Sequence, residues 1–355
     1  MPSTSKKARM AASVASVMFT NAVYFPNYRI YQGDTPGGMN YSCISHVFYA
    51  HASVGSDGGL SDEWADCQAP CDGVQGGLGS LMHLKQQHPH LQVILSVGGG
   101  NSSQIYPMVA SSAAMRDTFA RSARGLVEAS GLDGIDIAWE YPCDLEQGQN
   151  FLALLAAVRL YLPDDQYTLT AMLPAGKAVL QCIDVGQAAN YLDYINLMAY
   201  DFTGHWSLKS GHQSQLYAMH KHESSGSGGV TYLMSQGCPA KKILLGIPVF
   251  GRSFLHATGP DQKFKGAGGT DGVFEYNQLP RPKTKEAVDK RSVSATCVGG
   301  DGGFVTYDNP ETVKTKAGFC KQKGLGGLFY WTGPADARDK SRSLVAAGFR
   351  ALHTS

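Results

Sequence analysis

The residues of this chain that are best suited to chemistry lie in one short segment, Leu132-Asp-Gly-Ile-Asp-Ile-Ala-Trp-Glu-Tyr-Pro142. Because side chains alternate along a β-strand, a strand here would direct Asp136, Ala138 and Glu140 to one face. A buried carboxylate is costly unless it is paired, so Asp136 needs hydrogen-bond partners or a proton. Asp136 could either organise the protein interior or take part in catalysis, whereas Glu140 at the open end of the strand favours a functional site.

These carboxyl groups need a scaffold, and the chain alternates β-branched or aromatic runs with segments of helical periodicity. Such alternation is typical of βαβ units with a parallel sheet, and apolar stripes over 115–126, 151–158 and 339–352 predict helices outside it. The predicted strands, eight as in a barrel, are Ala22–Phe25, Ile44–Ala50, Gln92–Val97, Gly134–Glu140, Tyr167–Met172, Tyr194–Ala199, Ile243–Val249 and Gly327–Trp331. The sequence therefore predicts an α/β fold of the barrel class, with Glu140 at its mouth.

Two connections between the predicted strands, 51–77 and 252–305, are longer than a barrel needs. Because loops after barrel strands build the active face, both are expected to wall a cleft. The second is expected to hold a small subdomain, since 272–276 is strand-like and 281–291 is a charged turn or helix. The predicted division is an N-terminal extension (1–20), a barrel domain (21–252 and 305–355) and an insertion (253–304).

The acidic segment resembles the signature of the glycoside hydrolase family 18 chitinases, Asp-x-x-Asp-x-Asp-x-Glu. Three of its four acidic positions are present, as Asp133, Asp136 and Glu140. Further family motifs follow in order between residues 21 and 335, and several independent motifs argue against chance similarity. They are Tyr24-Phe25, His46-Val-Phe-Tyr-Ala50, Ser96-Val-Gly-Gly99, Met198-Ala-Tyr-Asp201, Gly246-Ile-Pro-Val-Phe-Gly-Arg252 and Leu325-Gly-Gly-Leu-Phe-Tyr-Trp331.

This resemblance implies a (β/α)₈ TIM barrel with a small α+β insertion between strands seven and eight. It also implies a retaining mechanism, in which Glu140 protonates the glycosidic oxygen while the 2-acetamido carbonyl of the substrate attacks the anomeric carbon. Tyr200 would hydrogen-bond the acetamido oxygen, Asp201 would contact the sugar, and Trp331 would form the floor beneath it. The remaining residues implied are Asp136 and Asp133 as catalytic, and Tyr24, Gly99, Tyr141, Met198 and Arg252 as substrate-binding.

Ala138 is the chief departure from the family signature, which has a third Asp at this position. That Asp would orient the acetamido group, stabilise the positive oxazolinium intermediate and share a proton with Glu140. Loss of one preorganised group of this kind typically costs about 10²–10³ in rate. Gly100 and His51 also stand where the family has Trp and Phe, so contacts to the sugar are expected to differ. The sequence leaves open whether Ala138 is natural or introduced.

Two functions from different classes follow from this pattern. The first is a chitinase acting on chitin and chito-oligosaccharides, with turnover impaired at Ala138. The alternative is a non-catalytic chitin-binding lectin of the same fold, because lectin relatives also lose signature acids. They usually lose the Glu too, so the retained Glu140 favours the enzyme. An endo-β-N-acetylglucosaminidase acting on glycoproteins is a third, disfavoured interpretation, since that branch usually lacks the large insertion.

The composition argues against several other partners. Lys and Arg total 30 against 29 Asp and Glu, so no basic surface for nucleic acid is expected. No apolar run reaches the roughly 18 residues of a membrane span. Four histidines lack a metal-binding spacing, and we expect no metal, no cofactor and a monomer. They are His205, His212, His220 and His222.

The N-terminal run 10–18 loosely imitates a secretory signal. Cleavage after Ala22 would cut into the first predicted strand, so we predict no cleaved signal and a cytoplasmic or non-classically secreted protein. An extracellular location is the alternative. Cys67 and Cys71 share a polar loop and could form a disulfide in an oxidising compartment, but reduced thiols are the expected state of the eight scattered cysteines.

Overall fold

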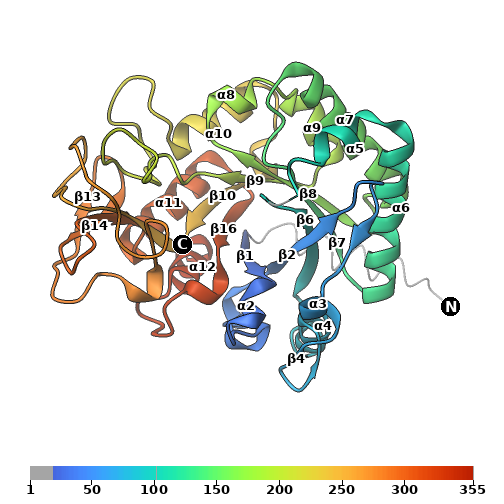
Figure 1. The fold of residues 1–355 in the computed structure, drawn as a ribbon, viewed down its shortest axis with the longest axis horizontal. Coiled ribbons are helices and arrows are strands. Elements are labelled where there is room, and N and C mark those ends of the chain that lie inside the picture. Colours follow the sequence, from blue (N-terminus) through green and yellow to red (C-terminus); the bar gives the residue numbers. More distant parts are fainter. Residues whose placement is uncertain (1–18, 101, 355) are drawn as a thin grey trace.

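The computed structural model of this chain describes residues 19–100 and 102–354. Within them, eight parallel strands form a closed ring in the order β1, β2, β6, β7, β8, β9, β10 and β16, which returns to β1. Helices surround this ring (Figure 1). The predicted (β/α)₈ TIM barrel is therefore confirmed. The strands are β1 (Thr20–Pro26), β2 (His46–Val54), β6 (Gln92–Gly98), β7 (Gly134–Ala138), β8 (Thr168–Pro174), β9 (Tyr194–Met198), β10 (Ile243–Pro248) and β16 (Gly327–Trp331).

Strand β2 differs most from its prediction, because it continues past Ala50 to Val54. A register shift between Ala50 and Ala52 allows the strand to continue, as a bulge does in other sheets. Its last residues then pair antiparallel with β3. The segment predicted as one long loop therefore contains short elements, which are β3 (Leu60–Ser61), α3 (Trp64–Cys67), β4 (Pro70–Cys71) and β5 (Val74–Gln75).

Capping residues mark the ends of several helices. Ser112 accepts from the backbone of Met115 to start α6, and Gly131 ends this helix in the left-handed conformation. The last helix starts at Leu344, later than predicted, because Ser343 is its N-cap. The helices are α2 (Tyr28–Tyr31), α4 (Gly77–Gln87), α5 (Tyr106–Ser111), α6 (Ala113–Ser130), α7 (Leu145–Tyr161), α8 (Lys177–Leu180), α9 (Val185–Tyr191), α10 (Gly226–Ser235), α11 (Pro310–Lys323) and α12 (Leu344–His353).

A five-stranded antiparallel sheet, at the left of Figure 1, forms the insertion between β10 and α11. Its bounds differ from the prediction, because Arg252 and Val305 lie in its strands and not in the barrel. The reason is that β11 pairs with β15, with Arg252 opposite Thr306. Among the described residues of 255–303 the helical part is one 3₁₀ turn, Tyr276–Gln278. The strands are β11 (Phe250–Phe254), β12 (Val273–Glu275), β13 (Ala287–Asp289), β14 (Ser294–Val298) and β15 (Phe304–Tyr307).

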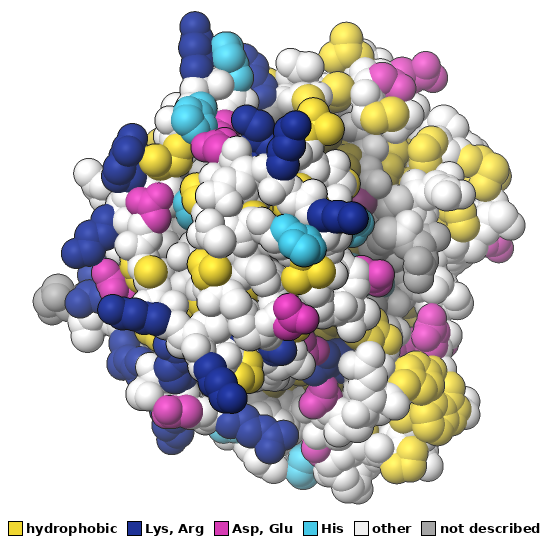
Figure 2. All heavy atoms as spheres, turned by 60° about the vertical axis from the view of Figure 1, so that its left-hand side comes forward, with side chains coloured by type: hydrophobic (Ala, Val, Ile, Leu, Met, Phe, Trp, Pro, Cys, Tyr) yellow, Lys and Arg dark blue, Asp and Glu magenta, His cyan; other side chains and the backbone are white. Residues whose placement is uncertain are grey.

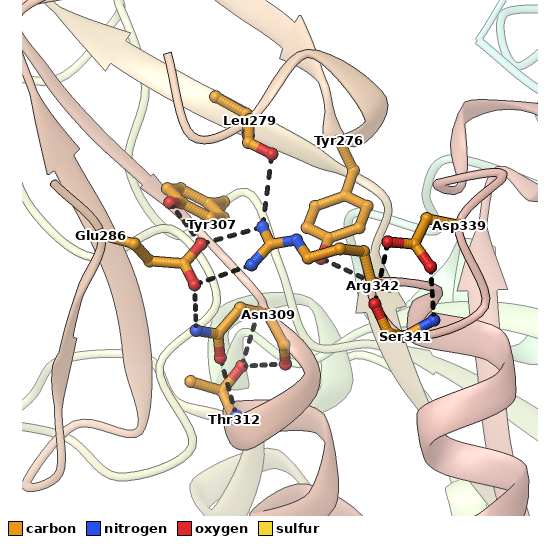
Figure 3. A network of polar contacts seen from close by, with 9 residues as sticks. All are labelled: Tyr276, Leu279, Glu286, Tyr307, Asn309, Thr312, Asp339, Ser341 and Arg342. Atoms are coloured by element: carbon orange, nitrogen blue, oxygen red, sulfur yellow. Dashed lines mark hydrogen bonds and ion pairs between the residues drawn. The ribbon is translucent and has the colours of Figure 1, made fainter. Parts of the chain in front are cut away.

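A polar network around Glu286 fixes this sheet to the barrel (Figure 3). The Arg342 guanidinium donates to both carboxylate oxygens of Glu286, at 2.9 and 3.0 Å. The Tyr307 hydroxyl and the Asn309 amide also donate to this carboxylate, at 2.8 and 2.9 Å. Burial alone would raise the pKa of Glu286, but these hydrogen bonds together lower it. Because Asn309 caps α11 and Arg342 precedes α12, the network joins the insertion to two barrel helices.

The buried apolar side chains form two main layers. One lies between the barrel strands and the helices. The other fills the barrel interior and surrounds the fully buried polar residues Asp136 and Asn196. Its buried members are Ala22, Tyr24, Phe48, Ala50, Ile94, Ala138, Met172, Met198, Tyr200, Leu244, Phe250 and Phe329. The residues predicted to do chemistry therefore lie within or directly above a packed interior.

On the face drawn in Figure 2, the Lys and Arg side chains gather on the left-hand half, with some Asp and Glu among them. All eight cysteines are free, and the Cys67 thiol donates to Asp62 at 2.7 Å.

In the described part of the chain, no helix combines the length and the apolar character needed to cross a membrane. The signal-like run 10–18 lies outside the described residues.

We predict that Glu286→Gln destabilises the fold at pH 7 by about 1–3 kcal/mol, because the Arg342 guanidinium loses its half-buried anionic partner. A depressed carboxyl pKa contributes stability above the unfolded value of roughly 4.3, and this stability is lost as the pH falls through the folded pKa. The difference from the unmodified protein should therefore vanish in strong acid. Thermal unfolding at several pH values measures it. Glu128→Gln, at an exposed pair on α6, should change nothing.

Candidate active site

Asp136 of β7 lies at the centre of the barrel interior and accepts hydrogen bonds from four other strands. The donors are the hydroxyls of Tyr24 (2.9 Å), Ser96 (2.6 Å) and Thr170 (2.6 Å), together with the more distant amide of Asn196 (3.4 Å). They belong to β1, β6, β8 and β9. The structure thus supplies the partners that the sequence required for this buried carboxylate.

The direction of these hydrogen bonds fits an ionised Asp136. Tyr24 accepts from the Asn196 amide at 2.7 Å, so the Tyr24 hydroxyl proton is free to point at Asp136. Burial raises the pKa of Asp136, while the hydroxyl donors oppose that rise. No described cation contacts this carboxylate. Neutral donors alone therefore stabilise the charge.

Glu140 follows β7 at the mouth of the barrel and is half-buried. Its backbone N–H donates to the Ser103 hydroxyl at 3.0 Å. Burial raises the pKa of the Glu140 carboxyl, and the negative charge of Asp201 raises it further. A raised pKa keeps a carboxyl protonated closer to neutral pH, as a general acid requires. Glu140 therefore has the electrostatic environment of a catalytic acid.

Asp201 and Arg252 form an ion pair where the barrel meets the antiparallel sheet. Arg252 Nε donates to Asp201 Oδ1 at 2.8 Å. The Arg252 guanidinium also lies 4.7 Å from the ring centroid of Trp206 and 5.3 Å from that of Phe250. These contacts hold Arg252 in place, so the insertion contributes a charged residue to the mouth.

Aromatic side chains line the barrel near Glu140. Trp331, at the end of β16, is half-buried, and its ring centroid lies 5.3 Å from that of Tyr24. Tyr200 is buried, and its hydroxyl has no hydrogen-bond partner among the described residues. Burial raises the pKa of Tyr200 well above its ordinary value, so this hydroxyl stays protonated. An unpaired buried donor is costly and is often satisfied by a ligand.

Two further predicted residues border the same space. Tyr141 is half-buried, and burial, followed by the charge of Glu140, raises its pKa. Met198 is buried in the interior cluster at the end of β9. Tyr141 directly follows Glu140 and Met198 lies two residues before Tyr200, so the motifs around Glu140 and Tyr200 converge at the mouth.

Ala138 is fully buried on β7, between the levels of Asp136 and Glu140. Its carbonyl accepts from the Gly99 backbone at 2.9 Å. Gly99 has a φ of 71°, and a β-carbon there would lie 2.6 Å from the His51 ring, so only glycine fits. The inner face of β7 therefore carries a methyl group where the family signature has a carboxylate.

The structure does not bring Asp133 to the mouth. This residue precedes β7 at the opposite end of the barrel, where Lys85 Nζ contacts it at 2.6 Å and the Val93 N–H donates to it at 2.7 Å. Asp133 is three residues from Asp136, and because side chains alternate along a strand, Asp133 faces the helices.

Sequence reasoning also missed Thr170 and Asn196. Their signal was an isolated polar residue within an otherwise apolar strand.

Comparison with known proteins supplies the family. The signature of the glycosyl hydrolases family 18 matches residues 20–336. This chain belongs to that family. It is 35% identical over 364 residues to Chitinase 1 of Aphanocladium album, an alignment that covers 94% of this chain and 85% of the relative.

Solved structures agree with this family. Chitinase ChiA74 from Bacillus thuringiensis has a TM-score of 0.84 and 25% identity, covering 94% of this chain and 69% of that one. A family 18 chitinase from Cycas revoluta, in complex with (GlcNAc)3, has a TM-score of 0.81 and 25% identity, covering 93% of this chain and 98% of that one. The fold and the family 18 assignment are thus consistent.

One group of described side chains has the proximity needed for a metal ion, namely His220, Glu223 and Asp261. All three are exposed, and their candidate ligand atoms lie within 4.8 Å of one another. The Glu223 carboxylate already accepts from two backbone amides at 2.9 Å. None of the three contacts the residues of the Asp136 network.

We predict that Asp201→Asn lowers the pKa of Glu140, because it removes the negative charge and leaves Arg252 unopposed nearby. The carbon-13 NMR shift of the Glu140 carboxyl, followed against pH, measures this midpoint directly. Asp165→Asn, at an exposed turn before β8, should leave the midpoint unchanged. An unchanged midpoint in Asp201→Asn would refute the proposed coupling.

Proposed function

We propose that this chain is a chitinase that hydrolyses β-1,4-linked N-acetylglucosamine polymers and oligomers. The observation that carries the proposal is Glu140, an acid at the barrel mouth whose pKa is raised by burial and by the charge of Asp201, two residues after the end of the strand that carries Asp136. The family assignment and the 35% identity to a chitinase support the activity. The (GlcNAc)3 complex of the Cycas chitinase supports the class of ligand.

The proposed reaction uses the acetamido group of the substrate as nucleophile. Glu140 donates its proton to the glycosidic oxygen as the bond from that oxygen to the anomeric carbon breaks. The acetamido carbonyl oxygen forms a new bond to this carbon and gives an oxazolinium ion. The Glu140 carboxylate then takes a proton from the water that attacks the anomeric carbon, the bond from this carbon to the acetamido oxygen breaks and restores the acetamido group, and the product retains the β configuration.

Other residues would hold the sugar in position for this step. The unpaired Tyr200 hydroxyl is available to donate to the acetamido oxygen. The half-buried Trp331 ring offers a flat apolar face to the pyranose. No cofactor is needed, since the proton and the nucleophile come from Glu140 and the substrate. A monomer suffices for this chemistry.

Ala138 is the reason to expect slow turnover. A methyl group at this level gives the positive oxazolinium ion no negative partner between Asp136 and Glu140. The same observation favours the second candidate function, a chitin-binding lectin that retains the groove without efficient catalysis. Hydrolysis separates the two candidates, because a lectin binds chito-oligosaccharides without cleaving them.

We predict that the protein cleaves chitohexaose and that the first products are β-anomers, because two inversions at the anomeric carbon restore its configuration. Proton NMR of the initial products measures the anomer. Glu140→Gln should abolish cleavage while the oligosaccharide still binds by calorimetry. Binding without cleavage by the unmodified protein would favour the lectin, and an initial α-anomer would exclude participation of the acetamido group.

We predict that Ala138→Asp raises kcat on a fluorogenic chitobioside by about 10²-fold. The added carboxylate would stabilise charge that develops mainly in the transition state, so KM should change little. Ala138→Asn, of similar size but uncharged, is the matched control and should give a much smaller gain. A change in kcat below about threefold in a folded Ala138→Asp variant would show that this position does not limit turnover.

A further inference from the structure

His51 lies on β2 at the barrel mouth, and the proposed reaction does not use it. Its ring stacks beside that of Trp331, with 5.9 Å between centroids and 24° between planes. The other side of the imidazole packs against Gly99, where any β-carbon would collide with it. The His51 ring therefore borders the surface on which the sugar is proposed to lie.

A chain of hydrogen bonds fixes the tautomer of this histidine. His51 Nδ1 lies 3.1 Å from the Ser96 hydroxyl oxygen. Ser96 donates its only hydroxyl proton to Asp136 at 2.6 Å, so towards His51 it acts as an acceptor. Nδ1 must then carry the ring proton. Burial lowers the pKa of His51 to about 4, so the ring is neutral at pH 7 and its Nε2 carries a lone pair.

Among the described residues the His51 ring makes its hydrogen bond through Nδ1, and Nε2 makes none. It is thus an oriented acceptor at the edge of the proposed sugar site. A phenylalanine here would keep the stacking on Trp331 but would offer no acceptor. The N-acetylglucosamine unit carries both hydroxyl and amide N–H donors, which match this acceptor.

Building on the proposed function, we propose that His51 is a specificity-determining residue. Its Nε2 accepts a hydrogen bond from a hydroxyl or amide N–H of the N-acetylglucosamine unit that stacks on Trp331. Ser96 and Asp136 act as positioning residues, because they hold the imidazole in the tautomer with Nε2 free. The buried Asp136 network therefore serves sugar recognition as well as the barrel interior.

The test compares ligand affinities in the Glu140→Gln background, which prevents turnover. His51→Phe keeps an aromatic ring and should weaken chitohexaose binding about tenfold by calorimetry, the size of one hydrogen bond. His51→Gln offers a carbonyl acceptor and should recover part of the loss. Equal affinity of the parent and a folded His51→Phe variant would overturn the proposal.

His46 provides a matched control at the opposite end of the same strand. Its Nδ1 also lies near a serine hydroxyl, 2.9 Å from Ser45, and burial lowers its pKa to about 4 as well. His46→Phe should leave the affinity for chitohexaose unchanged. If it weakens binding as much as His51→Phe, the effect is a general loss of barrel packing and the proposal fails.

Nitrogen-15 NMR tests the tautomer without any substitution. The expected spectrum has a protonated Nδ1 and an unprotonated Nε2, whose shift moves when chitohexaose is added. A protonated Nε2 would overturn the inference even if no His51 variant folds. If the Glu140→Gln parent binds no chitohexaose at all, the proposed function itself fails. If it binds and His51→Phe binds equally, only the role of His51 fails.

Discussion

The Asp136 carboxylate in the middle of the barrel constrains the side chains around it. It has no cationic partner among the described residues, so its burial depends on donors from β1, β6, β8 and β9. Removing a charge from water costs several kcal/mol unless such donors are aligned. The register of five strands must therefore be correct at one level of the barrel. Because the strands are held in register at the level of Asp136, their ends at the barrel mouth are also fixed relative to one another. Glu140, Tyr200 and Trp331 lie at these ends.

The candidate site spans two sheets whose attachment is also polar. The negative charge of Asp201 raises the pKa of Glu140, while Arg252 from the antiparallel sheet pairs with Asp201 and limits that effect. Arg252 keeps its place only if this sheet stays on the barrel. The Glu286 and Arg342 pair provides that attachment at a distance from the mouth. The acidity of Glu140 and the stability of the insertion are thus physically linked.

Ala138 illustrates a conflict between stability and activity within one strand. A second carboxylate beside Asp136 would have to share the same few neutral donors in a dry interior. The methyl group avoids that cost and packs with Tyr24 and Met198 in the interior cluster. It also removes a charge that would stabilise a cationic intermediate. Functional sites often retain such costly groups, and their loss commonly favours the fold over the reaction.

Local patterns in the sequence were sufficient to predict where the barrel strands lie, because alternation and apolar runs involve residues that are close together in the chain. They also placed Glu140 at a strand end and showed that Asp136 must find partners. They did not identify Thr170 or Asn196 as those partners, and they grouped Asp133 with the site although Lys85 binds it at the other end. They assigned Arg252 to the barrel and missed the bulge that continues β2 past Ala50.

The sequence by itself thus determined the strands, the family motifs and the acid at the mouth. Only the tertiary structure decided which polar groups meet inside the barrel, which tautomer His51 adopts and which sheet carries Arg252. The physical reason is that these contacts depend on strand register and ring closure. Both are set by pairings between residues far apart in the chain, which no local spacing records.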